Sequence, residues 1–339
     1  KSRRWTPYAK NRDNKMYYII VNPASKSGRG AKIWSMLMPV LEQKDIEYKV
    51  FFSAKIGHVT KLVRDLSDSV LVRNPESALK LIVLGGDGTL NEVIQGISDF
   101  GRVQLGYIPT GSSNDMARDL KLPESPLEIL DNILRCEKPC LMDIGCLVYE
   151  KASQQLSRQH DSEVSLKRYF AVSSGIGFDA AVCEEALASK FKNILNKIGL
   201  GKLTYLSIAL KQLIMARKIT CTITLDGKET VSIPKFLFVA GMIHQYEGGG
   251  FKFCPGADPR DGIIDICAVG NIPKWLILLA LPTAFKGNHY RFDGIDRYYA
   301  SRVHIETSAP LWVHTDGEVT MKSSSITLTC EREKLQLLL

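Results

Sequence analysis

Short apolar runs alternate with amphipathic stretches along the first part of the chain. Apolar and aromatic residues dominate at 17–21, 48–52, 81–84 and 103–108, and each run predicts a β-strand. Helical periodicity predicts helices at 31–42, 57–66, 90–97 and 115–120. Regular alternation of strand and helix favours an open, mostly parallel sheet with helices on both faces. We therefore predict a doubly wound α/β domain at residues 16–145, preceded by a basic segment at 1–15.

The pattern changes after Asp143. Residues 149–167 are polar and predict a long solvated loop or a hairpin tip. Further strands are predicted at 168–172, 219–225, 234–240, 263–269, 302–306 and 326–330, and helices at 180–191, 203–217 and 274–285. Asp226-Gly227 is typical of a hairpin turn, which indicates antiparallel pairing around it. Residues 146–339 are therefore predicted to form a mainly antiparallel, β-sandwich-like domain.

Three predicted strands of the α/β domain end in loops rich in Gly, Ser, Thr and Asn. The loops read NPASKSGRG at 22–30, GGDGT at 85–89 and PTGSSN at 109–114. Ligands of open α/β sheets bind beyond the carboxyl ends of the strands, so we expect the three loops to line one cleft. Their convergence carries more weight than any one glycine motif.

The loop at 85–89 joins a buried strand to a helix, an arrangement that favours an anion. Glycine lets a phosphate approach the main chain closely, and a helix N-terminus directs N–H groups toward it. Asp87 lies inside this turn, where a carboxylate is by itself a poor phosphate ligand. It makes chemical sense beside a cation or a hydroxyl proton, so the turn indicates phosphoryl transfer. Neither a Walker A pattern nor a complete GxGxxG motif occurs, which argues against a P-loop ATPase and a dinucleotide-dependent dehydrogenase.

Composition changes this picture only in part. The net charge of +8 and a pI near 9.0 favour an anionic partner, such as a nucleotide, a nucleic acid or a membrane surface. Much of the excess lies at 1–15, which we interpret as a solvated tail or a membrane-surface anchor. Eight cysteines without CxxC or zinc spacing predict free thiols in a reducing cytoplasm. The longest apolar run, at 275–281, is too short to span a bilayer.

Motifs along the whole chain narrow the function further. The signature turn at 85–91 is followed by PTGSSNDMAR at 109–118, MDIG at 142–145, GIGFDA at 175–180, GGG at 248–250, PGA at 255–257 with DG at 261–262, and DGE at 316–318. In this order they resemble the diacylglycerol kinase catalytic-domain superfamily, and within it the soluble bacterial-type lipid kinases, which are relatives of sphingosine kinases. The turn alone is similar to one in NAD kinases and is related to one in phosphofructokinases. The later motifs therefore distinguish the lipid kinases from these enzymes.

The resemblance implies ATP as phosphoryl donor, Mg²⁺, and a lipid hydroxyl at a membrane surface as acceptor. It implies a site between an NAD kinase/phosphofructokinase-like domain and the second domain, in a cytoplasmic enzyme peripherally associated with the membrane. No nucleic-acid partner is implied, and a homodimer is one possible assembly. By resemblance, the residues that contact ATP are Asn22, Ser25, Ser53, Gly86, Asp87, Gly88, Thr89, Asn91 and Thr110, with Ser53 standing where relatives usually carry threonine.

The resemblance also implies a structural Mg²⁺. Its ligands would be the carboxylate of Asp261 and the main-chain carbonyls of Asp258 and Ile263. Asp143 would belong to the network that links this metal to the nucleotide. Some relatives have a second acidic residue just before the metal-binding aspartate, whereas Arg260 stands there in this chain. This departure bears on the water-mediated part of the network and on metal affinity.

Two carboxylates compete for the role of general base toward the lipid hydroxyl. Asp87 lies in the glycine turn and Glu318 follows Asp316-Gly317. We favour Glu318 as base and Asp87 as the partner of a cation or hydroxyl. Asp-Gly is also a favourable hairpin turn, which would serve to present Glu318.

Other candidates receive structural interpretations. The histidines show no i, i+4 pairing, so no histidine metal site is predicted. Asp179 is predicted to cap a helix and Arg118 to form a structural ion pair, with Asp115 as one partner. The apolar segment at 275–286 is interpreted as a core helix, a membrane-docking segment or part of an acyl-chain pocket.

The function predicted from these residues is that of an ATP- and Mg²⁺-dependent lipid kinase, with diacylglycerol as acceptor and phosphatidic acid as product. The alternatives are a kinase for phosphatidylglycerol, a sphingoid base or ceramide, an NAD-kinase-like enzyme, and a non-catalytic lipid- or nucleotide-binding regulator. The motifs at 248–262 argue against the NAD-kinase-like enzyme, and Asp87, Asp261 and Glu318 argue against the regulator.

Overall fold

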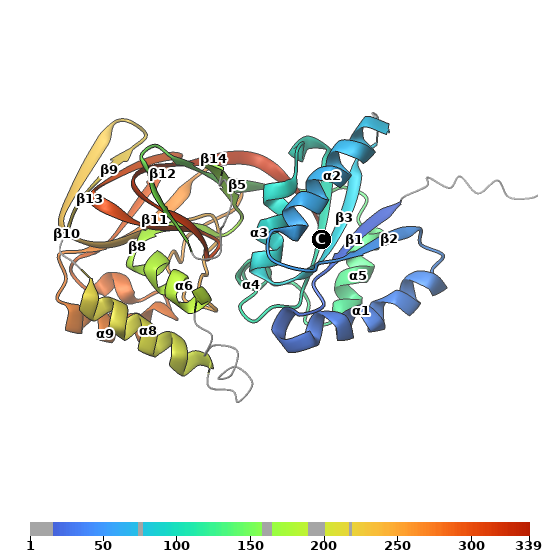
Figure 1. Cartoon of the computed structure of the whole chain (residues 1–339), viewed down its shortest axis with the longest axis horizontal. Helices are drawn as coiled ribbons and strands as arrows, with labels where there is room; N and C mark the ends of the chain where they lie inside the picture. The colour runs from blue at the N-terminus through green and yellow to red at the C-terminus, as the bar shows by residue number, and fades with distance from the viewer. Residues whose placement is uncertain (1–15, 74–76, 158–164, 189–200, 217–218) are drawn as a thin grey trace, which may run out of the picture.

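The computed structural model describes the backbone of residues 16–73, 77–157, 165–188, 201–216 and 219–339 (Figure 1). The basic segment at 1–15 lies outside the described residues. So do parts of the polar stretch at 149–167 and the ends of the helices predicted at 180–191 and 203–217.

The first part of the chain forms the parallel sheet that its apolar runs predict. The strands are β1 (Tyr17–Val21), β2 (Tyr48–Phe52), β3 (Leu79–Gly85) and β4 (Val103–Pro109), in the spatial order β4-β3-β1-β2. Helices α2 (His58–Arg73) and α3 (Asp87–Gly96) cover one face, and α1 (Ser25–Gln43) and α5 (Pro126–Arg135) cover the other.

The side chains of β3 alternate between these two faces. Leu81 and Val83 pack in the core with α2 and α3, whereas Ile82 and Leu84 pack in the core with α1 and α5. A strand that is apolar on both sides belongs in the middle of a sheet covered by two layers of helices. The sheet is therefore doubly wound, as predicted.

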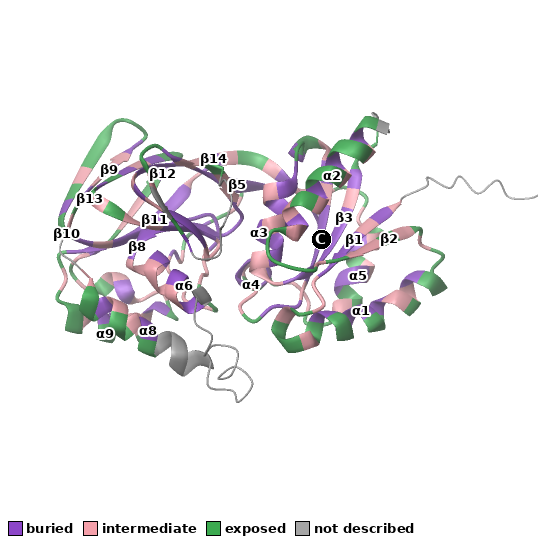
Figure 2. Cartoon of the chain, in the orientation of Figure 1, coloured by how far each residue is buried: buried purple, intermediate pink, exposed green. Residues whose placement is uncertain are grey.

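The second part is mainly antiparallel, as predicted. Its strands are β5 (Cys140–Tyr149), β6 (Ala152–Leu156), β7 (Lys167–Phe170), β8 (Ser173–Gly177), β9 (Ile219–Leu225), β10 (Glu229–Met242), β11 (Ile264–Gly270), β12 (Ile295–Ala300), β13 (Arg302–Thr315) and β14 (Glu318–Leu338). Their inner faces enclose an apolar core that includes Ile176, Ile223, Val239 and Ile326. Helices α6 (Phe178–Ala188), α8 (Gly201–Met215) and α9 (Lys274–Ala284) lie together at the lower left in Figure 1. Figure 2 shows that the buried residues follow the strands of both parts.

One long strand connects the two parts. β14 pairs with β13 and β5 in antiparallel fashion, and its end at Gln336–Leu338 pairs in parallel with β4. Leu337 and Leu338 enter the cores on the two faces of the first sheet. The described strands thus form one continuous sheet, and the end of the chain contributes to the first part.

The structure also contains elements that the apolar pattern does not reveal. These are α5, β5, β6, β8 and β12, together with the short 3₁₀ helices η1 (Phe100–Arg102) and η2 (His289–Arg291). β6 lies within the stretch predicted as a solvated loop or a hairpin tip, and its polar sequence pairs with β14. The flanking strands β5 and β7 pair in antiparallel fashion, as a hairpin requires. Helix α1 begins earlier than predicted, and Lys26, Ser27 and Gly28 near its start have positive φ.

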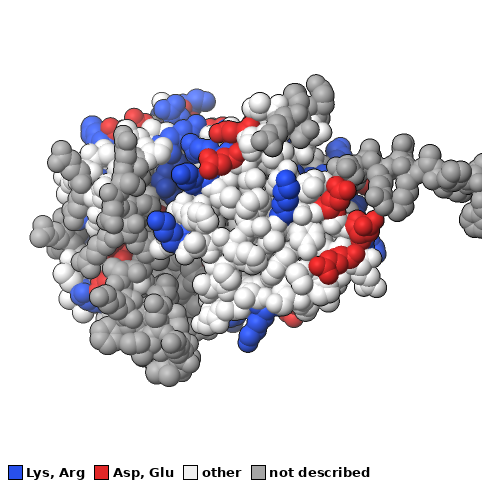
Figure 3. All heavy atoms as spheres, turned by 45° about the vertical axis from the view of Figure 1, so that its right-hand side comes forward, with Lys and Arg blue, Asp and Glu red and all other residues white. Residues whose placement is uncertain are grey.

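The thiols, the helices and the surface add three observations. All eight cysteines carry free thiols, and none of the described helices is long and apolar enough to cross a bilayer. Figure 3 shows one face of the molecule, on which several Lys and Arg side chains gather at the upper left beside a broad area without charged side chains.

Candidate active site

The loops that follow β1, β3 and β4 meet at one edge of the sheet. The amide of Asn22 donates a hydrogen bond to the Thr89 hydroxyl over 2.9 Å. The hydroxyl oxygens of Ser25 and Thr110 lie 2.6 Å apart. The first loop thus touches both others, and the convergence expected from the sequence is present.

The glycine turn before α3 lies directly against the loop after β4. Gly86 precedes the helix in an extended conformation, and a Cβ on it would lie 3.0 Å from the Gly111 Cα. Glycine at both positions therefore allows the two backbones to touch. The N-terminus of α3, a helix of 10 residues, opens at this point and suits an anion.

Asp87 joins the glycine turn to the loop after β4. Its Oδ2 accepts the N–H of Asn114 over 2.7 Å, and its Oδ1 accepts the N–H of Asp115 over 3.1 Å. Burial and the negative charge of Asp115 raise the pKa of Asp87 to about 7, although the N–H groups act in the opposite direction. Asp87 thus holds the loop after β4 in place, and its pKa lies near neutral pH.

A hollow of about 220 Å³ lies beside these loops. Three of the residues predicted to contact ATP line it, namely Asn22, Ser53 and Thr89. Its remaining wall is formed by Ala24, Ala54, Lys55, Ile56, Val59 and Glu92. Its wall mixes polar groups with apolar side chains, and it lies at the edge of the sheet where ligands of open α/β folds bind.

The second part of the chain contributes a turn to the same region. Asp316 and Gly317 have φ values of 51° and 80°, as a type I′ hairpin turn requires, and they join β13 to β14. Glu318 follows directly, and a Cβ on Gly88 would lie 2.6 Å from its Oε1. The carboxylate predicted to act as base therefore lies against the turn predicted to hold phosphate.

The Asp316 carboxylate anchors this turn between the two parts. Its Oδ1 accepts the N–H groups of Val172 over 2.8 Å and Ser173 over 3.1 Å. Its Oδ2 accepts the N–H of Ala171 over 2.9 Å and the amide of Asn91 over 2.8 Å. These donors come from both parts of the molecule, so the carboxylate fixes the position of Glu318 relative to α3.

Asn91 faces this anchor and not the hollow. Its side chain is buried, and its Oδ1 accepts a hydrogen bond from the Arg168 guanidinium over 3.0 Å. The Nε of Arg168 also donates to the Thr315 hydroxyl over 3.1 Å. The resemblance implies an ATP contact for Asn91, whereas the structure uses its amide to join α3 to β7 and to the Asp316 turn.

The loop predicted to bind Mg²⁺ is held by Asp143. The Oδ2 of this buried carboxylate accepts the N–H of Gly262 over 2.7 Å, and its Oδ1 accepts the N–H of Glu333 over 2.8 Å. Asp143 therefore connects the loop at 258–263 to the last strand of the chain.

The chemistry of this loop fits a hard cation. Partial burial and the charges of Asp258 and Asp143 raise the pKa of Asp261. A cation would relieve that accumulation of negative charge, and carboxylate and carbonyl oxygens are the ligands that Mg²⁺ takes in proteins. Asp261 with the carbonyls of Asp258 and Ile263 thus remains the predicted metal-binding set.

Helix α4 (Asp115–Asp119) makes a second contact between the parts. Asp115 Oδ2 accepts the N–H of Gly249 over 2.9 Å, and Asp119 Oδ2 lies 2.7 Å from His244 Nδ1. Arg118 pairs with Asp115 over 3.2 Å, which confirms the predicted ion pair.

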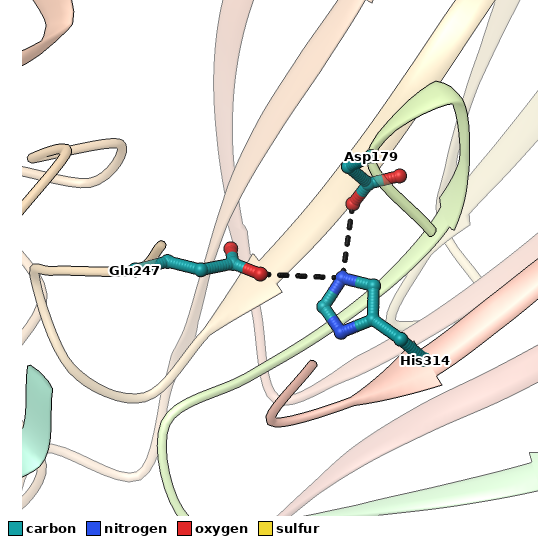
Figure 4. A group of neighbouring side chains, drawn as sticks. All are labelled: Asp179, Glu247 and His314. Atoms are coloured by element: carbon teal, nitrogen blue, oxygen red, sulfur yellow. Dashed lines mark hydrogen bonds and ion pairs between the residues drawn. The ribbon is translucent and has the colours of Figure 1, made fainter. Parts of the chain in front are cut away.

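A buried cluster lies behind the Asp316 turn (Figure 4). The Nε2 of His314 is 3.0 Å from Asp179 Oδ2 and 3.2 Å from Glu247 Oε1. Its Nδ1 accepts the N–H of Gly317 over 3.2 Å, which places the ring proton on Nε2, between the carboxylates. A metal bound to Nε2 would require the ring proton on Nδ1, where the Gly317 N–H already donates. The cluster therefore suits a bound proton better than a metal ion. Burial raises the pKa of Glu247 to about 7, in keeping with a proton held here.

Sequence reasoning missed this cluster and Arg168. It predicts that Asp179 caps a helix, whereas in the structure the carboxylate contacts His314. Burial lowers the pKa of Arg168, whereas the nearby negative charges of Glu318 and Asp316 raise it. The guanidinium therefore lies near the predicted base. No local spacing reveals these groups, because each side chain comes from a different strand, helix or loop.

Comparisons with known proteins cover both parts of the chain. Residues 16–145 match the family model "Diacylglycerol kinase catalytic domain", and residues 171–339 match "YegS C-terminal NAD kinase beta sandwich-like domain". The chain is 28% identical over 310 residues to "Putative lipid kinase YtlR" of Bacillus subtilis, covering 89% of this chain and 93% of that protein. It is 28% identical over 299 residues to a diacylglycerol kinase of Mycobacterium tuberculosis, covering 88% and 87%. The fold is similar to that described as "A putative diacylglycerol kinase from Bacillus anthracis str. Sterne", with a TM-score of 0.68 and 21% identity over 96% of this chain and 97% of the other.

Proposed function

This chain belongs to the diacylglycerol kinase catalytic-domain superfamily, and from that membership we propose that it transfers the γ-phosphoryl group of ATP to the hydroxyl of diacylglycerol. The family makes it a lipid kinase with an alcohol group as acceptor. The choice of diacylglycerol, with phosphatidic acid as product, is supported by relatives that carry the name diacylglycerol kinase.

The observation that carries the proposal is the contact between Gly88 and the Glu318 carboxylate. We assign the nucleotide to the hollow beside Asn22 and Ser53, with its phosphates at the glycine turn. The N-terminus of α3 would position the γ-phosphoryl group and stabilise its charge. Glu318 would accept the proton of the lipid hydroxyl as the new O–P bond forms and the bond to ADP breaks.

We assign Asp87 to positioning. Both of its oxygens accept main-chain N–H groups of the loop after β4, so the carboxylate organises the phosphate side of the site. A cation or a substrate hydroxyl next to Asp87 would interact with the same carboxylate oxygens that accept these N–H groups. Glu318 comes from the other part of the chain and approaches the turn from the acceptor side.

Mg²⁺ would be held by the Asp261 carboxylate and the carbonyls of Asp258 and Ile263. When bound, the ion would supply positive charge to the loop that Asp143 fixes through Gly262. The chain itself supplies the position of the loop. Asp143 fixes it by accepting the N–H of Gly262 in the loop and the N–H of Glu333 in β14.

The test is a transfer assay with radiolabelled ATP and mixed micelles that contain one lipid each: diacylglycerol, phosphatidylglycerol, sphingosine or ceramide. NAD is offered in a separate reaction. We expect labelled phosphatidic acid, and a rate about 10²- to 10⁴-fold lower for Glu318→Gln at unchanged ATP affinity. Glu229→Gln, in an exposed hairpin, is the matched control and should keep the wild-type rate.

Each failure has a distinct meaning in this assay. Labelling of a different lipid alone would overturn diacylglycerol as acceptor. Labelled NADP without labelled lipid would favour the NAD-kinase-like alternative. A wild-type rate for Glu318→Gln would remove this residue from the role of base.

A further inference from the structure

Helices α8 and α9 expose large apolar side chains on one side of the second part. The exposed set on these helices and the residue after α9 includes Leu210, Ile214, Met215, Trp275, Leu279 and Phe285, which we call the α8–α9 surface. Ile214 is 69% exposed and Trp275 is 63% exposed. Figure 2 shows this exposed region at the lower left of the molecule. Contiguous apolar surface of this kind marks an interaction site.

The two helices are joined at the point where the apolar residues meet. The ammonium of Lys274, at the start of α9, donates to the carbonyl oxygen of Ile214 over 2.8 Å and to that of Ala216 over 2.9 Å. The end of α8 is thereby tied to the start of α9. Ile214 and Trp275, both exposed, therefore lie at neighbouring ends of the two helices.

Helix α9 is apolar on both of its faces. Ile277, Ala280 and Ala284 are buried toward the protein, whereas Trp275 and Leu279 point to solvent. A core helix needs only the first of these faces. The second face is left without a partner among the described residues.

Charge distinguishes this surface from an ordinary apolar contact. The sequence has no Asp or Glu at 186–225 or at 266–292, and Lys274 and Lys286 lie in the second of these stretches, whereas Lys211 of α8 pairs with Glu185 of α6. Basic residues around an apolar face with an exposed tryptophan complement the surface of an anionic bilayer.

The α8–α9 surface also adjoins the candidate active site. Phe285 stacks on Phe251, with ring centroids 4.1 Å apart. Phe251 exchanges backbone hydrogen bonds with Glu247, and between them lies Gly249, which donates to Asp115 beside the glycine turn. A bilayer at this surface would lie next to the loop that closes on the phosphate side of the site.

We propose that the α8–α9 surface docks the protein on an anionic lipid bilayer. The inference rests on the proposed function in one respect, since a lipid acceptor resides in such a bilayer. The docking itself requires neither ATP nor turnover, so it is measured separately from catalysis.

The test is co-sedimentation of the full chain with vesicles of phosphatidylcholine, with or without phosphatidylglycerol, in the absence of ATP. The double variant Trp275→Gln/Leu279→Gln changes two exposed side chains, and Val72→Gln, 77% exposed on α2, is the matched control. We expect the vesicle partition coefficient of the double variant to fall about tenfold or more, with the control unchanged. Added salt should weaken wild-type binding to the anionic vesicles.

Transfer to a short-chain diacylglycerol dissolved in solution separates docking from function. The double variant should keep the wild-type rate with this substrate. Wild-type vesicle binding by the double variant, or none by the wild type, would overturn docking and leave the proposed function standing. Vesicle binding without transfer to any lipid would overturn the function alone. A dimer of the wild type that the double variant loses, at equal vesicle binding, would assign the surface to a second copy of the chain and overturn the proposal.

Discussion

Two Asp-Gly turns in the second part have similar φ values and different surroundings. Asp226 and Gly227 have φ values of 49° and 67°, and Asp316 and Gly317 have values of 51° and 80°. Asp226 lies at an exposed hairpin tip, where its Oδ1 accepts from the Ser301 hydroxyl and from a neighbouring N–H group. Asp316 instead accepts from three N–H groups and the Asn91 amide at the junction of the two parts.

The difference shows how a common turn becomes part of a site. The dipeptide fixes only the backbone conformation, and both turns satisfy it. The donors around Asp316 come from α3 and from the region of β7 and β8, so they set the position of the following Glu318. Asp226 has no comparable partner in the first part among the described residues.

The direct test of this comparison is removal of each carboxylate. Asp316→Ala leaves several buried donors without an acceptor, and we expect the free energy of unfolding to fall by about 3–5 kcal/mol. Asp226→Ala, in the exposed turn, should cost about 1 kcal/mol or less. Denaturant unfolding of both variants measures the difference. Equal losses would contradict a special role for the Asp316 anchor.

The contact between the turn and the first part is tested at Gly88. In Gly88→Ala the new methyl group would lie 2.6 Å from the Glu318 Oε1 and would displace that carboxylate. Because the carboxylate is the flexible end of a side chain, we expect the fold to persist and kcat to fall about 100-fold. Gly101→Ala, whose Cβ would meet only the Asp99 carboxylate at 3.3 Å, is the control. An unchanged kcat for Gly88→Ala would separate Glu318 from the reaction.

The pH dependence of stability sharpens the view of Asp87. Its pKa is raised to about 7, above its ordinary value of 3.8, so over the intervening pH range the folded state holds a proton that the unfolded state releases. The stabilisation that the bound proton of Asp87 contributes is complete below the unfolded-state pKa of 3.8 and is lost as pH rises through the folded-state pKa of about 7. We expect the Tm of the nucleotide-free protein to fall between about pH 5 and about pH 8, and to fall less in Asp87→Asn. Scanning calorimetry of both proteins measures this, and parallel curves would contradict the assigned pKa.

The smallest expected effect concerns the support behind the turn. In His314→Asn the amide oxygen can still accept the Gly317 N–H, whereas the contacts with Asp179 and Glu247 are lost. We expect kcat to fall about tenfold with the KM for ATP unchanged, and His314→Leu to fall further because it loses the Gly317 contact as well. If the two variants behave alike, the Gly317 hydrogen bond does not position Glu318.

The first part was the easier one to predict from sequence, for a local reason. Each apolar strand runs directly into its glycine-rich loop, so Asn22, Asp87 and Thr110 could be assigned to one edge of the sheet. Pairing between distant segments leaves no such signal. The parallel pairing of Gln336–Leu338 with β4 and the contact of Asp179 with His314 depend on tertiary structure alone.

Asn91 illustrates the same limit within a motif. It belongs to the signature turn by sequence, which suggested a nucleotide contact. Its neighbours in space are Arg168 and Asp316, and these decide the direction of its amide. Asp316-Gly317 was correctly predicted as a hairpin turn, but the sequence around it does not state which other elements it meets.

The central claim, that loops of the first part hold a triphosphate while Glu318 from the second part faces its last phosphate, is tested most directly by a crystal structure of the protein with a non-hydrolysable ATP analogue and Mg²⁺. We predict the nucleotide in the hollow lined by Asn22 and Ser53, with its γ-phosphate at the N-terminus of α3 and on the side of Glu318. A nucleotide bound elsewhere, or a γ-phosphate on the side of the turn away from Glu318, would contradict it.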